Sequence, residues 1–175
     1  VVRVFSTRRS FSALKSAGSV VSWGPDLDGG DNSLVAEQLT SDVVNLFSTG
    51  TSMAALKSDG SVVTWGLSTE DPRSESLGGD IDTGSPRGGD SSEVADLIDS
   101  DVVDIFSSRY AFAALKNDGS VVAWGDPLRG GDTGDAQRLL RKGVHSVAST
   151  GTSFAALKKN GRVVTWGDPW RGGSK

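Results

Sequence analysis

One stretch close to ALKSDGSVVTWG occurs four times in this chain, at residues 13–24, 55–66, 114–125 and 156–167. When one supersecondary unit is copied in this way, each copy usually buries its apolar face against its neighbours, which gives a solenoid, a propeller or a similar array. The repetition therefore constrains the fold strongly. It says much less about function, because no catalytic motif accompanies it.

The tryptophan near the end of each stretch sets the length of the repeat. Successive tryptophans are 42, 59 and 42 residues apart, so the unit has about 42 residues. The surplus of 17 residues in the second unit falls in a segment rich in Ser, Asp, Gly and Pro, which predicts a surface loop inserted at 67–87. We expect a single repeat domain over 1–175, with units at about 1–42, 43–101, 102–143 and 144–175.

Each unit carries the pattern of three strands. The first, at 1–6, 43–48, 102–107 and 144–149, is rich in β-branched residues. The second begins at Phe11, Met53, Phe112 or Phe154, and a turn such as Asp59-Gly60 joins it to the third, because Asp-Gly accepts the positive φ angles of a tight hairpin. Both faces of the third strand are apolar, so we expect sheets that are covered on both sides.

The fourth part of each unit is predicted to be a short helix. Asp90 with Glu93 three residues later resembles a capping box, and Val94, Leu97 and Ile98 follow at helical spacing. A fourth strand is the alternative. The sequence thus predicts a mainly β fold, a propeller-like array of four three-stranded antiparallel units with short connecting helices.

The repeat resembles that of a known family. The order Phe-Ala-Ala-Leu-Lys, Asp-Gly, Ser-Val-Val, Thr-Trp-Gly and later Gly-Gly is similar to the repeat of the regulator of chromosome condensation family, most of all to its divergent form in large tandem proteins of bacteria and unicellular algae. The resemblance covers nearly the whole chain apart from 67–87. It implies propeller blades, which in that family usually number seven in a closed ring. For four shorter copies a four-bladed ring, an open arc and half of an oligomeric ring are the alternatives.

Composition narrows the classes of partner. The formal net charge is −4, which argues against a dedicated nucleic-acid binder, because such proteins usually carry a basic face. No apolar run approaches the roughly 20 residues that cross a bilayer, so we expect a soluble chain without a transmembrane segment, and peripheral membrane association stays open. The absence of cysteine leaves the compartment undetermined. A chain that starts with Val1 also suggests a processed piece of something longer, with a trimmed chain as the equal alternative.

The sequence offers few residues for a catalytic or metal-binding site. His145 is the only histidine, so neither a zinc site nor a Ser-His-Asp arrangement has its residues. Acidic glycine-rich segments such as 26–31 lack the spacing of a calcium-binding loop, and we interpret them as turns followed by a helix cap. We therefore predict no enzyme, no cofactor and no metal site.

Aromatic and arginine residues supply the candidate sites. We expect four tryptophans at equivalent positions to be core wedges between units: Trp23, Trp65, Trp124 and Trp166. Trp170 has no aromatic counterpart in the other units, and with Arg171 it is a candidate partner contact. The turns between the first two strands read Arg8-Arg9 and Arg109-Tyr110 in alternate units, an arginine and aromatic composition that interfaces favour. Solvated turn arginines are the alternative.

These observations predict a protein-interaction or structural scaffold that acts without catalysis and binds other protein subunits in a larger assembly. An accessory subunit of an algal complex is one form of this prediction, and it rests on the kind of repeat. A module that binds a glycan or small ligand is the second hypothesis. The third is guanine-nucleotide exchange on a small GTPase, which only the family resemblance suggests.

Overall fold

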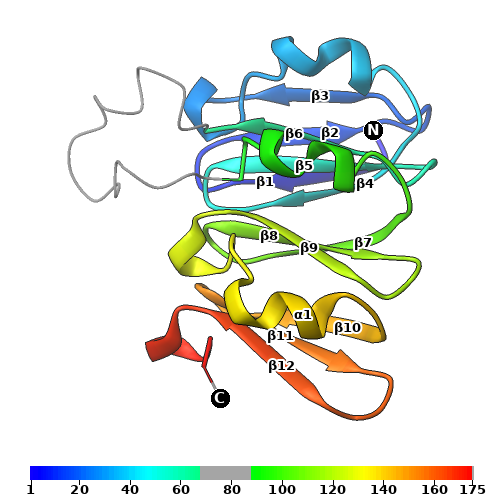
Figure 1. The fold of residues 1–175 in the computed structure, drawn as a ribbon. Helices are drawn as coiled ribbons and strands as arrows, with labels where there is room; N and C mark the ends of the chain where they lie inside the picture. Colours follow the sequence, from blue (N-terminus) through cyan, green and yellow to red (C-terminus); the bar gives the residue numbers. More distant parts are fainter. Residues whose placement is uncertain (68–87, 175) are drawn as a thin grey trace.

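The computed structural model describes residues 1–67 and 88–174, so the predicted loop at 67–87 lies, apart from Leu67, outside the described residues. The described chain forms four antiparallel three-stranded sheets, each with its strands in sequence order (Figure 1). We call each sheet a blade. The strands are β1 (Arg3–Ser6), β2 (Phe11–Leu14) and β3 (Val20–Trp23); β4 (Val43–Ser48), β5 (Ser52–Lys57) and β6 (Val62–Gly66); β7 (Val102–Ser107), β8 (Ala111–Lys116) and β9 (Val121–Gly125); and β10 (Val144–Ser149), β11 (Ser153–Lys158) and β12 (Val163–Gly167).

The Asp-Gly sequences form the hairpin turns between the second and third strands, as predicted. Gly60 adopts a φ of 82°, and its amide donates to the Lys57 carbonyl at 3.0 Å. In the third blade the Gly119 amide donates to the Lys116 carbonyl in the same way, at 2.9 Å. Asp59 Oδ1 accepts from the backbone amide of Ser61 at 2.9 Å and from its hydroxyl at 2.7 Å. A side chain that satisfies backbone amides fixes the turn and hence the register of the hairpin.

These turns give a first prediction. Hydrogen bonds, above all from Ser61 and Ser120, hold the pKa values of Asp59 and Asp118 below the ordinary value of 3.8. Because a lowered folded-state pKa stabilises only the ionised form, this contribution is present above pH 3.8 and is lost as the pH falls through the folded-state pKa. We expect Ser61→Ala and Ser120→Ala each to raise the pKa of its own aspartate in an NMR titration. An unchanged pKa would contradict the assignment.

Short helical segments connect the blades, as predicted. They are η2 (Ser33–Leu39), η4 (Ser92–Leu97) and the pair η6 (Gly134–Ala136) and α1 (Gln137–Leu140), and most of this length is 3-10 helix. The expected capping box does not form at Asp90, because its carboxylate accepts from the amide of Ser92, two residues later, at 2.9 Å. Each connection buries one apolar residue almost completely: Leu39, Ile98 or Leu140. Within the described residues, shorter turns of 3-10 helix follow the third strands of the first, third and fourth blades: η1 (Asp26–Asp28), η5 (Pro127–Arg129) and η7 (Pro169–Arg171).

The apolar core lies between successive blades rather than within one blade. The cluster between the first two blades joins Leu14 and Leu39 to Leu46, Met53 and Trp65, and equivalent clusters fill the next two junctions. Each junction has an indole that reaches across it: Trp65, Trp124 and Trp166 donate Nε1–H to the carbonyls of Gly29, Gly88 and Gly130 at 3.0, 3.1 and 3.1 Å. The tryptophan therefore packs as a wedge and satisfies its only polar group at the same time.

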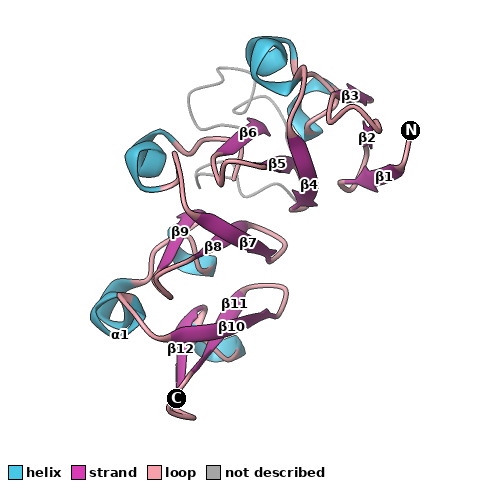
Figure 2. Cartoon of the chain, turned by 90° about the vertical axis from the view of Figure 1, so that its right-hand side faces the viewer, coloured by secondary structure: helices cyan, strands magenta, loops and turns pink. Residues whose placement is uncertain are grey.

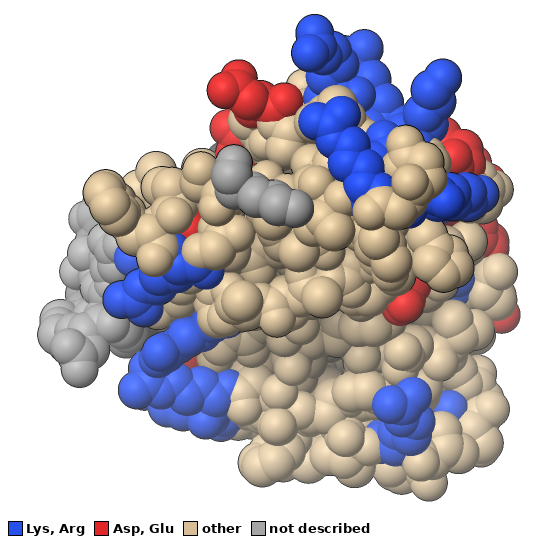
Figure 3. Space-filling model, turned by 90° about the horizontal axis from the view of Figure 1, so that it is seen from below, with Lys and Arg blue, Asp and Glu red and all other residues tan. Residues whose placement is uncertain are grey.

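The blades follow one another in an open arc, with β1, β4, β7 and β10 toward its concave side and the helical connections toward its convex side (Figure 2). The first and fourth blades stand at opposite ends. A view from the side of the fourth blade shows uncharged atoms in the middle of the molecule and most charged side chains toward its outline (Figure 3). The single chain thus forms an arc and not a closed four-bladed ring, a shape that fits both the open arc and half of an oligomeric ring.

One core prediction is wrong. Trp23 is 47% exposed, whereas Trp65, Trp124 and Trp166 are between 3% and 5% exposed. Trp23 still stacks on Phe11, with ring centroids 5.7 Å apart, as Trp124 stacks on Phe112 and Trp166 on Phe154. The physical reason is that each wedge is buried by the blade before it, and no blade precedes the first one in this structure.

Candidate protein-interaction site

The turns between the first and second strands stand in one row along an edge of the arc. The Arg8 amide donates to the Gly50 carbonyl at 3.0 Å, the Gly50 amide to Arg109 at 2.9 Å and the Arg109 amide to Gly151 at 3.1 Å. The loops that contain η1, η5 and η7 lie at the same edge, on the left of Figure 1, and the Asp126 and Asp168 amides donate to carbonyls of the adjacent turns. We call this edge the turn rim.

A hydroxyl shapes each of these turns. Thr7, Thr49, Ser108 and Thr150 each accept, through Oγ, the backbone amide three residues later at 3.0–3.1 Å. Ser and Thr support tight turns in this way because their hydroxyls replace a backbone acceptor. The side chains at the two central positions of each turn are therefore free to vary between blades, and they carry the arginines.

Arg9 is held by an ion pair inside the protein. Its Nε lies 2.8 Å from Oδ2 of Asp28, which is buried in the η1 turn, while half of the Arg9 side chain stays exposed. The Arg9 N–H does not point along a hydrogen bond to Asp28 Oδ2, so the contact is an ion pair only. The main role that the structure shows for Arg9 is thus to neutralise a buried carboxylate.

This pair gives a second prediction. Arg9→Ala is expected to lower the free energy of unfolding by about 1 to 3 kcal/mol, because it leaves the buried Asp28 carboxylate without its cation. Arg8→Ala, on the same exposed turn, should change it by less than about 0.5 kcal/mol. Urea denaturation measures both. Equal stabilities for the two variants would show that the ion pair does not matter.

In the third blade, different residues connect the turn to the neighbouring η5 loop. Tyr110 takes the place of Arg9, and Arg129 takes the place of Asp28, so a cation–π contact replaces the ion pair, with the Arg129 guanidinium 4.6 Å from the ring centroid. Arg129 also pairs with the buried carboxylate of Asp126. The Arg109 guanidinium lies 5.5 Å from the same ring. Tyr110 therefore lies against two guanidinium groups.

The fourth blade presents its aromatic residue to solvent. Trp170 is 93% exposed, and its backbone amide donates to Asp168 Oδ1 at 2.9 Å, which fixes the η7 turn. Arg171 lies 3.6 Å from the Asp168 carboxylate and is largely exposed. Among the described residues Arg8 has no ion pair or side-chain hydrogen bond.

The structure brings the six candidate residues of the sequence to one edge. Arg8, Arg109, Trp170 and Arg171 are exposed there, Tyr110 is half-buried, and Arg9 is engaged by Asp28. Arg129 belongs to the same surface and was missed, although Asp126 and Arg129 recur as Asp168 and Arg171 at the spacing of an ion pair on one helical turn. That recurrence was the signal that could have identified it.

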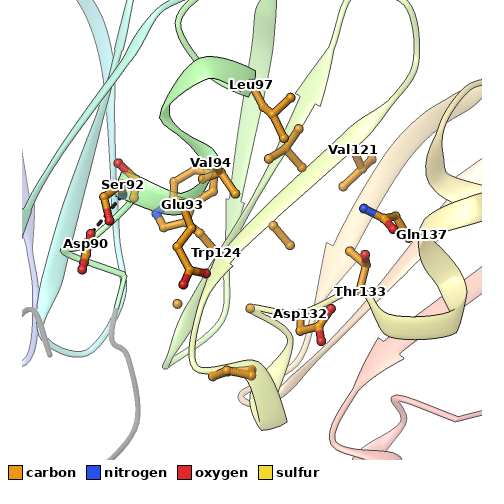
Figure 4. A pocket seen from close by; sticks show the side chains of 16 residues that line it. Asp90, Ser92, Glu93, Val94, Leu97, Val121, Trp124, Asp132, Thr133 and Gln137 are labelled. Atoms are coloured by element: carbon orange, nitrogen blue, oxygen red, sulfur yellow. Dashed lines mark hydrogen bonds between the residues drawn. The ribbon is translucent and has the colours of Figure 1, made fainter.

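A groove runs along the convex side, on the outer strand of the third blade. It has a volume of about 480 Å³ and lies between η4 and the η6–α1 connection. Glu93 lines it from the η4 side, and Asp132, Thr133 and Gln137 line it from the opposite side (Figure 4). The fourth blade has an equivalent groove beside β12. The grooves recur because each of these third strands lies beside the helical connection that precedes its blade, so they follow from the repeat and do not mark one special blade.

Comparison with known proteins identifies the fold. Yeast RCC1 (Prp20) bound to Kap60 superposes with a TM-score of 0.59 at 20% identity, over 94% of this chain and 42% of Prp20. Human WBSCR16 gives a TM-score of 0.52 at 21% identity, over 95% of this chain and 47% of that protein. The fold is that of an RCC1-like β-propeller. The chain spans less than half the length of these propeller proteins.

A second structure of Prp20p from Saccharomyces cerevisiae, described with its binding to Gsp1p and histones, gives a TM-score of 0.56 at 20% identity, over 94% of this chain and 43% of that one. No protein-family model matches the sequence, and no curated protein matches it significantly. None of the described helices is long and apolar enough to cross a membrane. The likeness to RCC1-like proteins therefore concerns the fold.

Proposed function

We propose that this RCC1-like array is a non-catalytic scaffold that binds other protein subunits through its turn rim, within a larger assembly such as an algal complex. The observation that carries the proposal is the gathering of exposed arginines and a nearly fully exposed tryptophan at one edge, from blades far apart in sequence. Tryptophan and arginine are the side chains that most often dominate the energy of protein interfaces.

The geometry favours a protein partner over a small ligand. The turn rim is an extended row, since its backbone hydrogen bonds join turns from all four blades. A row suits a broad protein surface, whereas small ligands are usually enclosed in a concave pocket. The related folds are also described through protein partners, Kap60 in one case and Gsp1p and histones in the other.

The partner surface that fits is acidic. Arg8, Arg109 and Arg171 are exposed cations of the rim, opposite in sign to the net charge of −4 of the chain. A guanidinium binds a carboxylate through two parallel hydrogen bonds, and an exposed indole adds apolar area beside it. We therefore expect contacts with Asp and Glu side chains of the partner around an apolar site for Trp170.

The test is copurification of the tagged full chain from its native source. We expect stoichiometric protein partners with the wild-type chain, and a loss of at least about tenfold in recovered partner for the triple variant Arg8→Ala, Arg109→Ala and Trp170→Ala. Arg9 is left unchanged because it neutralises Asp28. The melting temperature should stay the same.

Lys15→Ala with Lys159→Ala is the matched control, because both lysines are exposed and lie at the hairpin ends of their blades, away from the turn rim. This control should retain the partners. Full partner recovery by the triple variant, or a chain that copurifies only with a small ligand, would overturn the proposal.

A further inference from the structure

The two ends of the arc expose the two halves of the junction that the chain builds three times internally. We call the side of a blade that faces the preceding blade its leading face, and the opposite side its trailing face. In each internal junction the leading face contributes the Trp wedge, and the trailing face contributes a glycine carbonyl that accepts its Nε1–H. The leading face of the first blade and the trailing face of the fourth have no such partner among the described residues.

The free leading face retains the apolar residues of a junction. Val4, Phe11, Val21 and Trp23 are between 45% and 56% exposed, whereas their counterparts in the second blade are almost fully buried against the first blade: Leu46, Met53, Val63 and Trp65. The Phe11 and Trp23 rings are already stacked as they are inside the array. This face thus has the composition and the ring geometry of a buried junction while it is exposed.

The free trailing face is its complement. Leu157 and Val163 are 41% and 38% exposed, whereas the equivalent Leu14 and Val20 are buried. Uncharged atoms fill the middle of the view from this side (Figure 3). A helical residue also enters each internal junction, and no such segment follows η7 within the described residues. The trailing face therefore consists of the strands and the η7 loop.

The position next to Gly172 is empty for an apolar residue near the start of a second strand, which fills the equivalent position in each internal junction. In the internal junctions, the space next to the equivalent glycines is filled by the next blade, since a Cβ would lie 3.4 Å from Met53 at Gly29, 2.4 Å from Phe112 at Gly88 and 2.6 Å from Phe154 at Gly130. At Gly172 the backbone has the left-handed conformation of Gly29 and Gly130, with a φ of 102°, and nothing described lies within 4 Å of that position. Phe11 of another copy has the size and the place in the repeat to occupy it.

The backbone ladder of the turn rim is also open at both ends. Each turn donates its amide to the carbonyl of the next turn, and the series ends at the amide of Gly151. Within the described chain this amide has no hydrogen-bond partner, and neither has the Arg8 carbonyl at the other end. In that part of the chain the Gly151 amide is thus a free donor and the Arg8 carbonyl a free acceptor. A further turn at either end would form with them the same hydrogen bond that joins the internal turns.

We propose that two copies of this chain associate head to tail, with the leading face of blade one in each copy bound to the trailing face of blade four in the other. Trp23 Nε1–H then donates to the Gly172 carbonyl, and the Gly151 amide donates to the Arg8 carbonyl of the second copy. Two such contacts close a ring with the blades of both arcs, eight in all, at the upper end of the roughly four to eight blades of known propellers. The occupant is a second copy because the internal junctions already show that these two faces fit each other.

The first test is the mass of the chain in solution, measured by light scattering over a range of protein concentrations. We expect a discrete dimer, and we expect Trp23→Ala and Leu157→Glu each to convert it to a monomer. Trp170→Ala is the matched control for the loss of an exposed indole, since its counterpart Leu128 stays 75% exposed beside the next blade. This control should remain dimeric, so a failure of the turn-rim proposal and a failure of this one can be told apart.

Mixing the two monomeric variants tests the head-to-tail arrangement. The Trp23→Ala copy retains an intact trailing face and the Leu157→Glu copy an intact leading face, so the mixture should form a dimer through one repaired contact. Circular dichroism establishes that each variant is folded. A monomeric wild type at every concentration, growth beyond two copies, or a mixture that stays monomeric would overturn the proposal.

Discussion

Replacing Trp124 with Ala is expected to lower the free energy of unfolding by about 3 to 5 kcal/mol. The indole is buried in the junction between the second and third blades, stacks on Phe112 and donates to the Gly88 carbonyl at 3.1 Å. Its removal leaves a cavity and an unsatisfied carbonyl in a core that consists of only two packed faces. Equilibrium denaturation in urea measures the change.

Trp23→Ala is the matched control, because it deletes the same side chain from the equivalent position of the first blade, where no other described blade covers it. It should cost about 1 kcal/mol, the value of the stacking on Phe11 alone, when measured at a dilution where the chain is monomeric. A small effect at Trp124 would refute its role as a wedge, and an equally large effect at Trp23 would show that burial by the preceding blade is not the cause.

Gly130→Ala should be the second most destabilising change, by about 3 kcal/mol. An added Cβ would lie 2.6 Å from Cδ2 of Phe154, which cannot move aside because it is buried and stacked on Trp166. Overpacking of this kind costs roughly 1 to 3 kcal/mol, and a φ of 104° adds roughly 1 to 2 kcal/mol for any residue other than glycine.

Gly172→Ala separates these two contributions. Gly172 has nearly the same φ, 102°, with nothing described within 4 Å, so in the monomer only the backbone strain of about 1 to 2 kcal/mol should appear. Thermal and urea unfolding of both variants at the same dilution provide the comparison. Equal losses would mean that the contact with Phe154 contributes nothing, contrary to the packing described above.

The repeat allowed much of the fold to be predicted. Strands begin and end within about two residues of the expected positions, and the Asp-Gly turns and short helices lie where the pattern placed them. These features depend on local chemistry, since a residue such as Gly60 adopts its left-handed φ wherever the turn occurs. Local sequence could not show that Trp23 is exposed, because the residues around it closely resemble those around the buried wedges.

The candidate site was predictable only in part. The alternation of Arg8-Arg9 and Arg109-Tyr110 singled out the turns, but the different roles of the two cations in the first turn depend on Asp28, which is 19 residues from Arg9 in the chain. The same holds for Arg129, whose contact with Tyr110 requires the η5 loop to fold back against the turn. Contacts between segments that are distant in sequence determine which charges remain exposed.

The sequence by itself determined the unit: three antiparallel strands, a tight hairpin, the short helix between blades and a tryptophan near the end of each third strand, because each depends on residues that are close together in the chain. The tertiary structure alone decided that four such units form an open arc, and hence which copies of the same residue are buried. Burial of a wedge depends on whether another blade lies beside it. For that reason Trp23 and Trp124 are equivalent in sequence, yet one is a core residue and the other an exposed side chain that can bind a second copy.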